Sequence, residues 1–160
     1  MHWLFTVLLH KQSGHRVSLF NIYVHVLLSE KRTCWDSLKS YPGMHTLENV
    51  IIARDLNVTL NVEEKKGCSP VRDPTREWVK DIIMDWDLED IKSSRGKFTW
   101  LNKRLVPGHI AARLDRFLIQ TSFLTLGLFA SSKNFPTYSS NHKPIMLELS
   151  IEENLGPIPF

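Results

Sequence analysis

The sequence predicts an α/β or α+β fold with a mixed sheet, because β-type runs alternate along the chain with segments of helical periodicity. In the segment Pro144–Ile151, apolar residues recur at every second position, which is typical of a strand with one buried face. In the segment after Asp73-Pro74, apolar residues recur at helical spacing instead. A chain of 160 residues with both patterns is predicted to form one domain.

Two strands near the beginning of the chain are predicted to form a hairpin. The β-type runs Trp3–Leu9 and Val17–Val26 flank a polar segment that contains Gly14. A third strand is expected at Asn49–Ala53, where a nearly continuous apolar run indicates burial on both faces. The chain is therefore expected to begin directly on a core strand.

Two helices are predicted. Ser29 is a candidate N-cap for a helix that runs to Ser40. The residues on its inner face are Cys34, Trp35 and Leu38. A second helix is expected to begin with Asp73 as N-cap and Pro74 at the first helical position. Its residues at helical spacing, which we interpret as core rather than as ligand-stacking groups, are Trp78, Ile82, Ile83 and Trp86.

The second half of the chain is predicted to hold shorter β segments between loops. Residues 61–72 form a long polar loop in this prediction, Phe98–Trp100 a strand fragment and Ala111–Ile119 a longer strand. The Gly- and Pro-containing end of the chain, residues 153–160, is predicted to be a flexible tail. The folded domain is therefore expected to span residues 1–152.

The composition allows a packed core and excludes a disordered chain, with 42% hydrophobic and 23% charged residues. The net charge of +3 tolerates a nucleic-acid partner without arguing for one, since dedicated binders usually carry a dense basic stripe. The basic side chains that could touch a phosphate backbone, unless they are simply solvated surface groups, are Lys97, Lys103, Arg104 and Arg116.

Cysteine usage and the N-terminal segment indicate an intracellular protein that does not cross a membrane. Cys34 and Cys68 lie far apart and form neither a C-x-x-C motif nor a disulfide framework, so we expect reduced thiols. The apolar stretch Trp3–Leu9 is shorter than the roughly 20 residues that a membrane-spanning helix needs. It also lacks the basic flank and cleavage site of a signal peptide.

Three polar motifs each lie against a run of β-type apolar residues. They are Asp55-Leu56-Asn57, Arg113-Leu114-Asp115-Arg116 and Ser140-Asn141-His142. An unpaired polar group at the end of a buried strand costs several kcal/mol, so such endings usually have a task. The three motifs are therefore predicted to converge at one edge of a sheet.

These residue types suit metal-assisted attack of water on a phosphodiester. Asp55 and Asn57 can hold or deprotonate a water and donate to a phosphate oxygen, with Tyr23 nearby. His142 is a proton carrier near neutral pH, and Asp115 could fix its tautomer. The oxygen ligands favour Mg²⁺ over zinc. In the plainer alternative, the first motif is only a turn and Asp115 forms an ion pair with Arg113.

Taken in order, the motifs resemble those of the endonuclease/exonuclease/phosphatase superfamily, over residues 17–151. The segments that carry the resemblance are Asn21-Ile22-Tyr23, Asp55-Leu56-Asn57, Phe98-Thr99-Trp100, Arg113-Leu114-Asp115 and Ser140-Asn141-His142-Lys143-Pro144-Ile145. The family patterns behind them are G-D-x-N, R-x-D and S-D-H. The chain looks most like the apurinic-type endonuclease domain of plant non-LTR (LINE-type) retroelements.

The resemblance implies a four-layer α/β sandwich of two mixed sheets flanked by helices, part of which this chain would form. It also implies a Mg²⁺-dependent hydrolase that cleaves phosphodiester or phosphomonoester bonds by in-line attack of water. In that pattern Tyr23 contacts the scissile phosphate, Asp55 positions or activates the water and Asn57 orients the phosphate. Asp115 orients His142, which stabilises charge on the phosphoryl oxygens. Phe98 and Trp100 match core strand positions.

Three departures from the family pattern predict weak or absent catalysis. No residue before Trp3 matches the early Asn and the metal-ligating Glu, so we expect residues 1–152 to be the C-terminal part of a truncated domain. Asn141 stands where the family has an acidic residue, so it is a degenerate metal-ligand position. Ala53-Arg54 stands where the family pattern has a glycine-containing pair. Glycine at this place permits backbone angles that other residues rarely adopt.

Three hypotheses follow for the function. The chain is an impaired Mg²⁺-dependent DNA endonuclease, a non-catalytic module that binds nucleic acid or protein, or a retroelement fragment without a selected function. DNA is the partner that the resemblance implies, and no small-molecule cofactor is expected. A nuclear location follows only from the resemblance. The sequence leaves the oligomeric state and the substrate-binding residues open.

Overall fold

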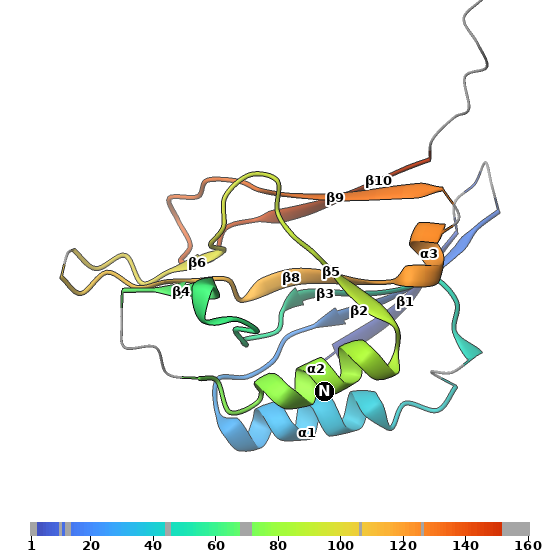
Figure 1. Cartoon of the computed structure of the whole chain (residues 1–160), viewed down its shortest axis with the longest axis horizontal. Helices are drawn as coiled ribbons and strands as arrows, with labels where there is room; N and C mark the ends of the chain where they lie inside the picture. Colours follow the sequence, from blue (N-terminus) through green and yellow to red (C-terminus); the bar gives the residue numbers. More distant parts are fainter. Residues whose placement is uncertain are drawn as a thin grey trace, which may run out of the picture.

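The computed structural model describes residues 3–9, 11, 14–43, 46–67, 72–105, 107–125 and 127–151. Two helices cover one face of a five-stranded sheet and a two-stranded sheet covers the other face (Figure 1). A small three-stranded sheet extends from one end. This arrangement confirms the predicted α/β sandwich class. The predicted tail at residues 153–160 and Cys68 lie outside the described residues.

The elements are short and numerous. The strands are β1 (Trp3–Leu9), β2 (Arg16–Ile22), β3 (Val50–Asp55), β4 (Lys65–Lys66), β5 (Leu88–Ile91), β6 (Trp100–Leu101), β7 (Ala111–Ala112), β8 (Asp115–Gln120), β9 (Leu128–Asn134) and β10 (Ile145–Ile151). The helices are α1 (Leu28–Lys39), α2 (Arg76–Asp85) and α3 (Thr121–Thr125), and a 3₁₀ turn, η2, lies at Val62–Glu64. None of the helices in the described ranges is long and apolar enough to cross a membrane.

The five-stranded sheet is mixed and has the order β1-β2-β3-β8-β5. The predicted hairpin is confirmed, since β1 and β2 pair antiparallel. Strand β2 runs parallel to β3, with α1 as the crossover between them, and β8 pairs antiparallel with both β3 and β5. The predicted second strand is too long by four residues, because the chain leaves the sheet after Ile22 and Val24 bonds to the carbonyl of Asp55 instead.

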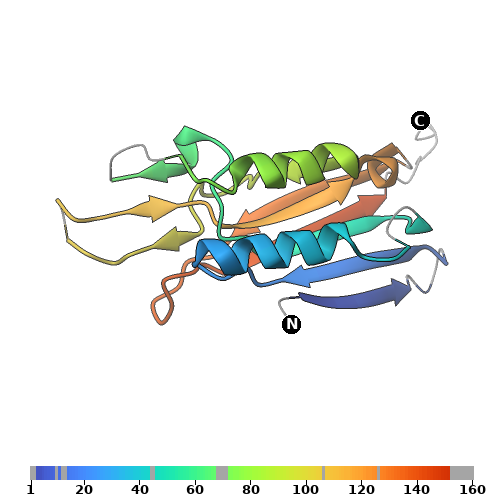
Figure 2. The same cartoon turned by 90° about the horizontal axis from the view of Figure 1, so that it is seen from below.

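The two faces of this sheet carry separate apolar clusters. On one face, α1 and α2 lie side by side (Figure 2) and bury residues such as Trp35, Leu38 and Ile82 against the strands. The predicted inner face of α1 is confirmed, and so is the core position of Trp86. On the other face, residues of β9 and β10 such as Leu147 pack over β3 and β8.

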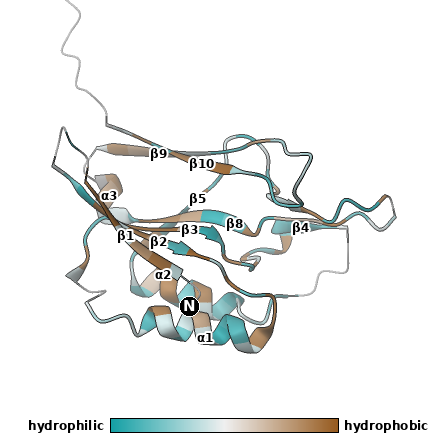
Figure 3. Cartoon of the chain, turned by 180° about the vertical axis from the view of Figure 1, so that it is seen from behind, coloured by the Kyte–Doolittle hydropathy of each residue, from teal (hydrophilic) through white to brown (hydrophobic). Residues whose placement is uncertain are grey.

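Strand β1 lies at the free edge of the sheet and is apolar along most of its length (Figure 3). Its side chains Trp3 and Phe5 pack against Phe20 and Tyr41, with ring centroids 4.9 to 5.7 Å apart. The prediction that the described chain begins on a core strand is therefore wrong, because β1 is an edge strand without a buried residue and its leucines, Leu4, Leu8 and Leu9, are exposed.

Both predicted helix caps are wrong. Leu27 occupies the N-cap of α1, and Ser29 lies inside the first turn, where its carbonyl accepts a hydrogen bond from the hydroxyl of Thr33. Thr75 occupies the N-cap of α2. Asp73 instead closes a turn before the helix, because its Oδ1 accepts from both the amide and the hydroxyl of Thr75.

The predicted strand Ala111–Ile119 is two strands in different sheets. It breaks at Arg113-Leu114, so β7 joins the three-stranded sheet and β8 the five-stranded one. The predicted loop at residues 61–72 contains η2 and β4. Strands β5 and β9 have no counterpart in the prediction, since the polar run Ser131-Ser132-Lys133 hides the strand pattern of β9.

Candidate active site

The three polar motifs meet at one end of the β3–β8 pair. Asp55 is the last residue of β3 and Asp115 the first residue of β8, and the two are direct partners in the sheet register. His142 lies in the connection between β9 and β10 and forms an isolated bridge with Trp100 of β6. The predicted convergence at a sheet edge is therefore found in the structure.

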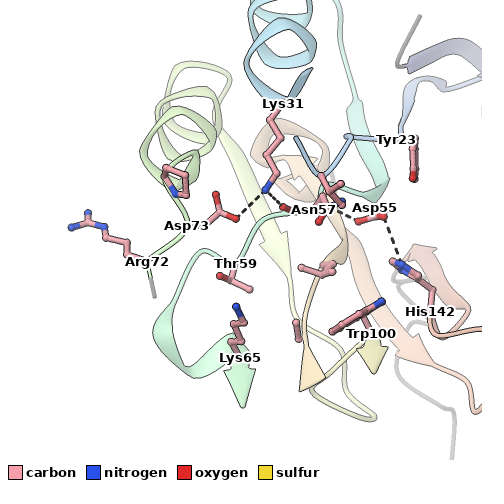
Figure 4. A pocket seen from close by; sticks show the side chains of 14 residues that line it. Tyr23, Lys31, Asp55, Asn57, Thr59, Lys65, Arg72, Asp73, Trp100 and His142 are labelled. Carbon is pink, nitrogen blue, oxygen red and sulfur yellow. Dashed lines mark hydrogen bonds and ion pairs between the residues drawn. The ribbon is translucent and has the colours of Figure 1, made fainter. Parts of the chain in front are cut away.

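His142 lies between the two carboxylates, and its contact with Asp55 is drawn in Figure 4. Its Nδ1 is 2.9 Å from Oδ2 of Asp115, and its Nε2 is 3.8 Å from Oδ2 of Asp55. Asp55 is only 6% exposed and Asp115 8%, whereas His142 is half-buried. When Nδ1 donates to Asp115, Nε2 of a neutral ring is left with a free lone pair that faces the pocket. The alternative of a simple Asp115–Arg113 ion pair is wrong, because Arg113 bonds elsewhere.

Asp55 is buried beside another carboxylate. Burial and the negative charge of Asp115 raise the pKa of Asp55, against the opposing effects of His142 and of the amide of Asn57. That amide donates to Oδ1 of Asp55 at 3.0 Å. The first motif is therefore a turn as well as a site element. A carboxylate with a raised pKa is a better base near neutral pH than an ordinary one.

Asn57 is tied into the surrounding backbone. Its side-chain amide donates to the carbonyl of Val24 at 3.1 Å, and its own carbonyl accepts from Nζ of Lys31 at 2.5 Å. Lys31 also contacts Oδ2 of Asp73 at 3.1 Å, so it links α1 to the segments before and after the polar loop. The sequence prediction missed this lysine, although its spacing to Cys34 on the buried stripe of α1 is a signal that could have found it.

A pocket of about 460 Å³ opens at this point. Tyr23 lines it with an exposed side chain. The lining residues labelled in Figure 4 are Tyr23, Lys31, Asp55, Asn57, Thr59, Lys65, Arg72, Asp73, Trp100 and His142. Trp100 was predicted to be only a core strand position, but it is half-buried and lines the pocket.

Asn141 is exposed and directly precedes His142, which belongs to a group of side chains that could hold a metal ion. Among the described residues, the His, Cys, Asp and Glu side chains that offer such a group are Asp55, Asp115 and His142, whose ligand atoms lie within 4.8 Å of one another. The backbone carbonyl of Asn141 accepts from the amide of Leu101 at 2.9 Å. Two neighbouring buried carboxylates fit a divalent cation, because a cation would relieve their mutual repulsion.

The arginines that flank Leu114-Asp115 belong to a buried charge cluster, which we define as Glu64, Asp90, Arg113 and Arg116. Arg113 lies 3.0 Å from Glu64 and 2.6 Å from Asp90, and Arg116 lies 2.9 Å from each of the same carboxylates. Burial is the largest single effect and would raise the pKa of Glu64, but the charge and hydrogen bond of Arg116, the amide of Leu60 and the charge of Arg113 together lower this pKa to about 2. The same arginines hold the pKa of Asp90 well below its usual range.

Arg116 is 1% exposed, so the prediction that it touches a phosphate backbone is wrong. Its guanidinium forms ion pairs with two buried carboxylates, so it is not accessible to a phosphate. The other three basic residues of that prediction, Lys97, Lys103 and Arg104, are exposed.

Arg54 lies in β3 with a backbone φ of 98°, in the left-handed region that favours glycine. Its side chain is exposed, and it pairs with Arg116 in the sheet register. A non-glycine residue therefore holds a left-handed backbone conformation next to Asp55.

The fold has relatives among solved structures. The chain superimposes on the endonuclease domain of TRAS1, a telomere-specific non-LTR retrotransposon, with a TM-score of 0.66 at 14% identity over 92% of this chain and 69% of that one. It has the fold of a retrotransposon endonuclease domain. A functionally unknown conserved protein from Enterococcus faecalis V583 matches with a TM-score of 0.60 at 11% identity, over 94% of this chain and 56% of that one. No protein-family model and no curated protein sequence matches the chain.

Proposed function

We propose that this chain is a nuclease-type hydrolase that cleaves the phosphodiester bonds of DNA slowly and with Mg²⁺. The observation that carries the proposal is the Asp115–His142–Asp55 arrangement at the pocket, in a fold shared with a retrotransposon endonuclease domain. The sequence resemblance supports an origin from plant non-LTR retroelements, and a chain that acts on chromosomal DNA would work in the nucleus.

Each side chain has a role in this proposal. Asp55 orients a water and takes its proton as the water oxygen attacks phosphorus and the bond to the leaving oxygen breaks. Asp115 accepts from Nδ1 of His142, and with both ring nitrogens protonated Nε2–H donates to the phosphoryl oxygens, where negative charge grows in the transition state. Tyr23 and Asn57 contact the phosphate. The raised pKa of Asp55 suits a proton acceptor.

Asp55 and Asp115 supply the negative charge that would hold Mg²⁺. The cation, when bound, would polarise a phosphoryl oxygen and make the attacking water more acidic. Asp115 already accepts a hydrogen bond from His142, and Asn141 offers a neutral amide where the family pattern has an acidic residue. We therefore expect weak cation binding and slow turnover.

Plasmid nicking by the purified protein with Mg²⁺ tests the proposal, beside Asp55→Ala and His142→Ala. Slow nicking that both substitutions abolish supports the proposal. Nicking that survives both substitutions would come from a contaminant, and no nicking above background would contradict a hydrolase function. A calorimetric Mg²⁺ titration of Asn141→Asp should show tighter binding than in the unchanged chain, and equal binding would remove Asn141 from the cation site.

A non-catalytic binding module is the second candidate. The neutral Asn141 would weaken cation binding, while cationic side chains that could bind phosphate line the pocket. Lys65 and Arg72 line the pocket with exposed side chains. Protein without nicking activity that retains DNA, with an affinity that falls steeply with salt, would favour this candidate. Lys65→Gln should then weaken retention and flatten its salt dependence.

A further inference from the structure

We propose that Thr99 is a positioning residue that fixes Asp115 relative to His142. Thr99 lies immediately before β6 and is 1% exposed. Its hydroxyl, amide and carbonyl bond to the segment that leads into Asp115 and to the connection that carries His142. The consequence for catalysis rests on the proposed hydrolase function, but the geometric role does not.

The hydroxyl of Thr99 holds the backbone that leads into Asp115. Its Oγ1 accepts hydrogen bonds from the amides of Leu114 at 3.0 Å and Asp115 at 2.9 Å. These amides lie where the chain leaves β7 and enters β8. A hydroxyl oxygen has two acceptor lone pairs, so both are engaged. Without this oxygen the amide of buried Asp115 would lose its acceptor, which is costly.

The backbone of Thr99 connects the same segment to the connection that carries His142. Its amide donates to the carbonyl of Ala112 at 3.0 Å, and its carbonyl accepts from the amide of Lys143 at 2.7 Å. Thr99 thus bonds to a residue before Asp115, to Asp115 itself, and to the residue after His142. Its neighbour Trp100 adds the bridge to His142.

One residue therefore sets the distance between two side chains that are 27 positions apart in sequence. The hydrogen bond from His142 to Asp115 is 2.9 Å long, so a backbone shift of about 1 Å would break it, and misplacement of that size can cost about 10²-fold in rate. The charge cluster holds Arg113 and Arg116 on either side, but it makes no bond to the His142 connection that the structure records. Thr99 supplies that bond, beside Leu101, whose amide donates to the carbonyl of Asn141, and Thr99 is the one of the two that also bonds to the amide of Asp115.

The substitution Thr99→Val tests the inference because it keeps the shape and removes the acceptor. Thr99→Ser restores the acceptor, and Thr33→Val, on the exposed face of α1, is the matched control. The probe is the ¹⁵N spectrum of the His142 ring, which reports the tautomer that Asp115 selects. We expect Thr99→Val to lose the Nδ1–H tautomer signature, and Thr99→Ser and Thr33→Val to keep it.

Nicking kinetics give the second readout. In Thr99→Val we expect kcat to fall by about 10²-fold with KM almost unchanged, and Thr99→Ser to recover most of it. If the unchanged chain does not nick DNA, the proposed function fails, while the ring spectrum still decides the role of Thr99. A folded Thr99→Val protein with an unaltered His142 spectrum would overturn the inference.

Amide hydrogen exchange in the unchanged chain covers the case in which Thr99→Val does not fold. The amides of Leu114 and Asp115 should be strongly protected, because Thr99 Oγ1 accepts from both. Exchange of both amides at the rate of an open loop would equally overturn the inference.

Discussion

Asp55 and Asp115 are direct partners across the β3–β8 pair, with Asp55 as the last residue of β3 and Asp115 as the first residue of β8. Antiparallel pairing thus brings two buried carboxylates together, and only Asp115 has the ring of His142 at hydrogen-bond distance. This asymmetry separates their roles. Asp115 orients the histidine, and Asp55 is left with a raised pKa and an oxygen that faces the pocket.

The substitution Asp115→Asn is expected to lower the nicking rate by about 10²- to 10⁴-fold without unfolding the chain. A neutral amide stabilises the oriented ring less than a carboxylate does, and its NH₂ group can favour the other tautomer. The rate of plasmid nicking and the ring ¹⁵N shifts of His142 are the measurements. An unchanged rate with a changed tautomer would mean that the orientation of His142 is irrelevant to the chemistry.

The substitution Asp55→Asn is expected to stabilise the fold at pH 7 while it abolishes nicking. The folded pKa of Asp55 is raised, so above that pKa the folded chain carries a charge that burial and Asp115 disfavour. Below the ordinary value of 3.8 the carboxyl is protonated in both states, and the difference should vanish. Urea denaturation of both proteins at several pH values measures this. A less stable Asn variant at pH 7 would contradict the assigned cause of the shift.

The substitution Glu64→Gln is expected to cost about 3–5 kcal/mol at pH 7, because it leaves two buried arginines with Asp90 alone. The folded pKa of Glu64 is about 2, below its ordinary 4.5. Its contribution is therefore fully present above pH 4.5 and is lost as the pH falls toward 2.

The unchanged chain should accordingly lose stability over this acid range, and the Gln variant should lose less. The exposed pair Lys133–Glu148 supplies the control, since Glu148→Gln is expected to leave stability almost unchanged at every pH. Denaturation curves that shift equally for both variants would show that the charge cluster is no stronger than a surface ion pair.

The substitution Arg54→Gly is expected to raise the free energy of unfolding by about 1 kcal/mol, because glycine adopts a φ of 98° without strain. Arg54→Ala removes the same charge and keeps the strain, so it should give no such gain. Urea midpoints of the three proteins decide between these effects. Equal stabilisation by Gly and Ala would assign the gain to the arginine side chain rather than to the backbone.

The sequence predicts those elements whose pattern is local. The hairpin β1–β2, helix α1, strand β3 and the alternating strand β10 follow from apolar periodicity. Strand β9 does not, because its central residues are polar, and its extended form comes from pairing with β10 on one edge and from the bridge between Ser93 and Ser132 on the other. The predicted caps of α1 and α2 also fail, because α1 begins directly after Leu27 and α2 directly after Thr75, while Asp73 bonds to Thr75 before α2 begins.

The amino-acid sequence by itself determined which chemical groups are present and that Asp55, Asp115 and His142 end strands or lie beside them. Only the tertiary structure decided which group bonds to which. Asp115 bonds to His142, and Arg113 forms ion pairs with Glu64 and Asp90. Arg113 is nonetheless much nearer to Asp115 in the sequence than His142 is. Strand register and burial choose these partners, because a buried charge is stable only where the fold brings an opposite charge or a hydrogen bond to it.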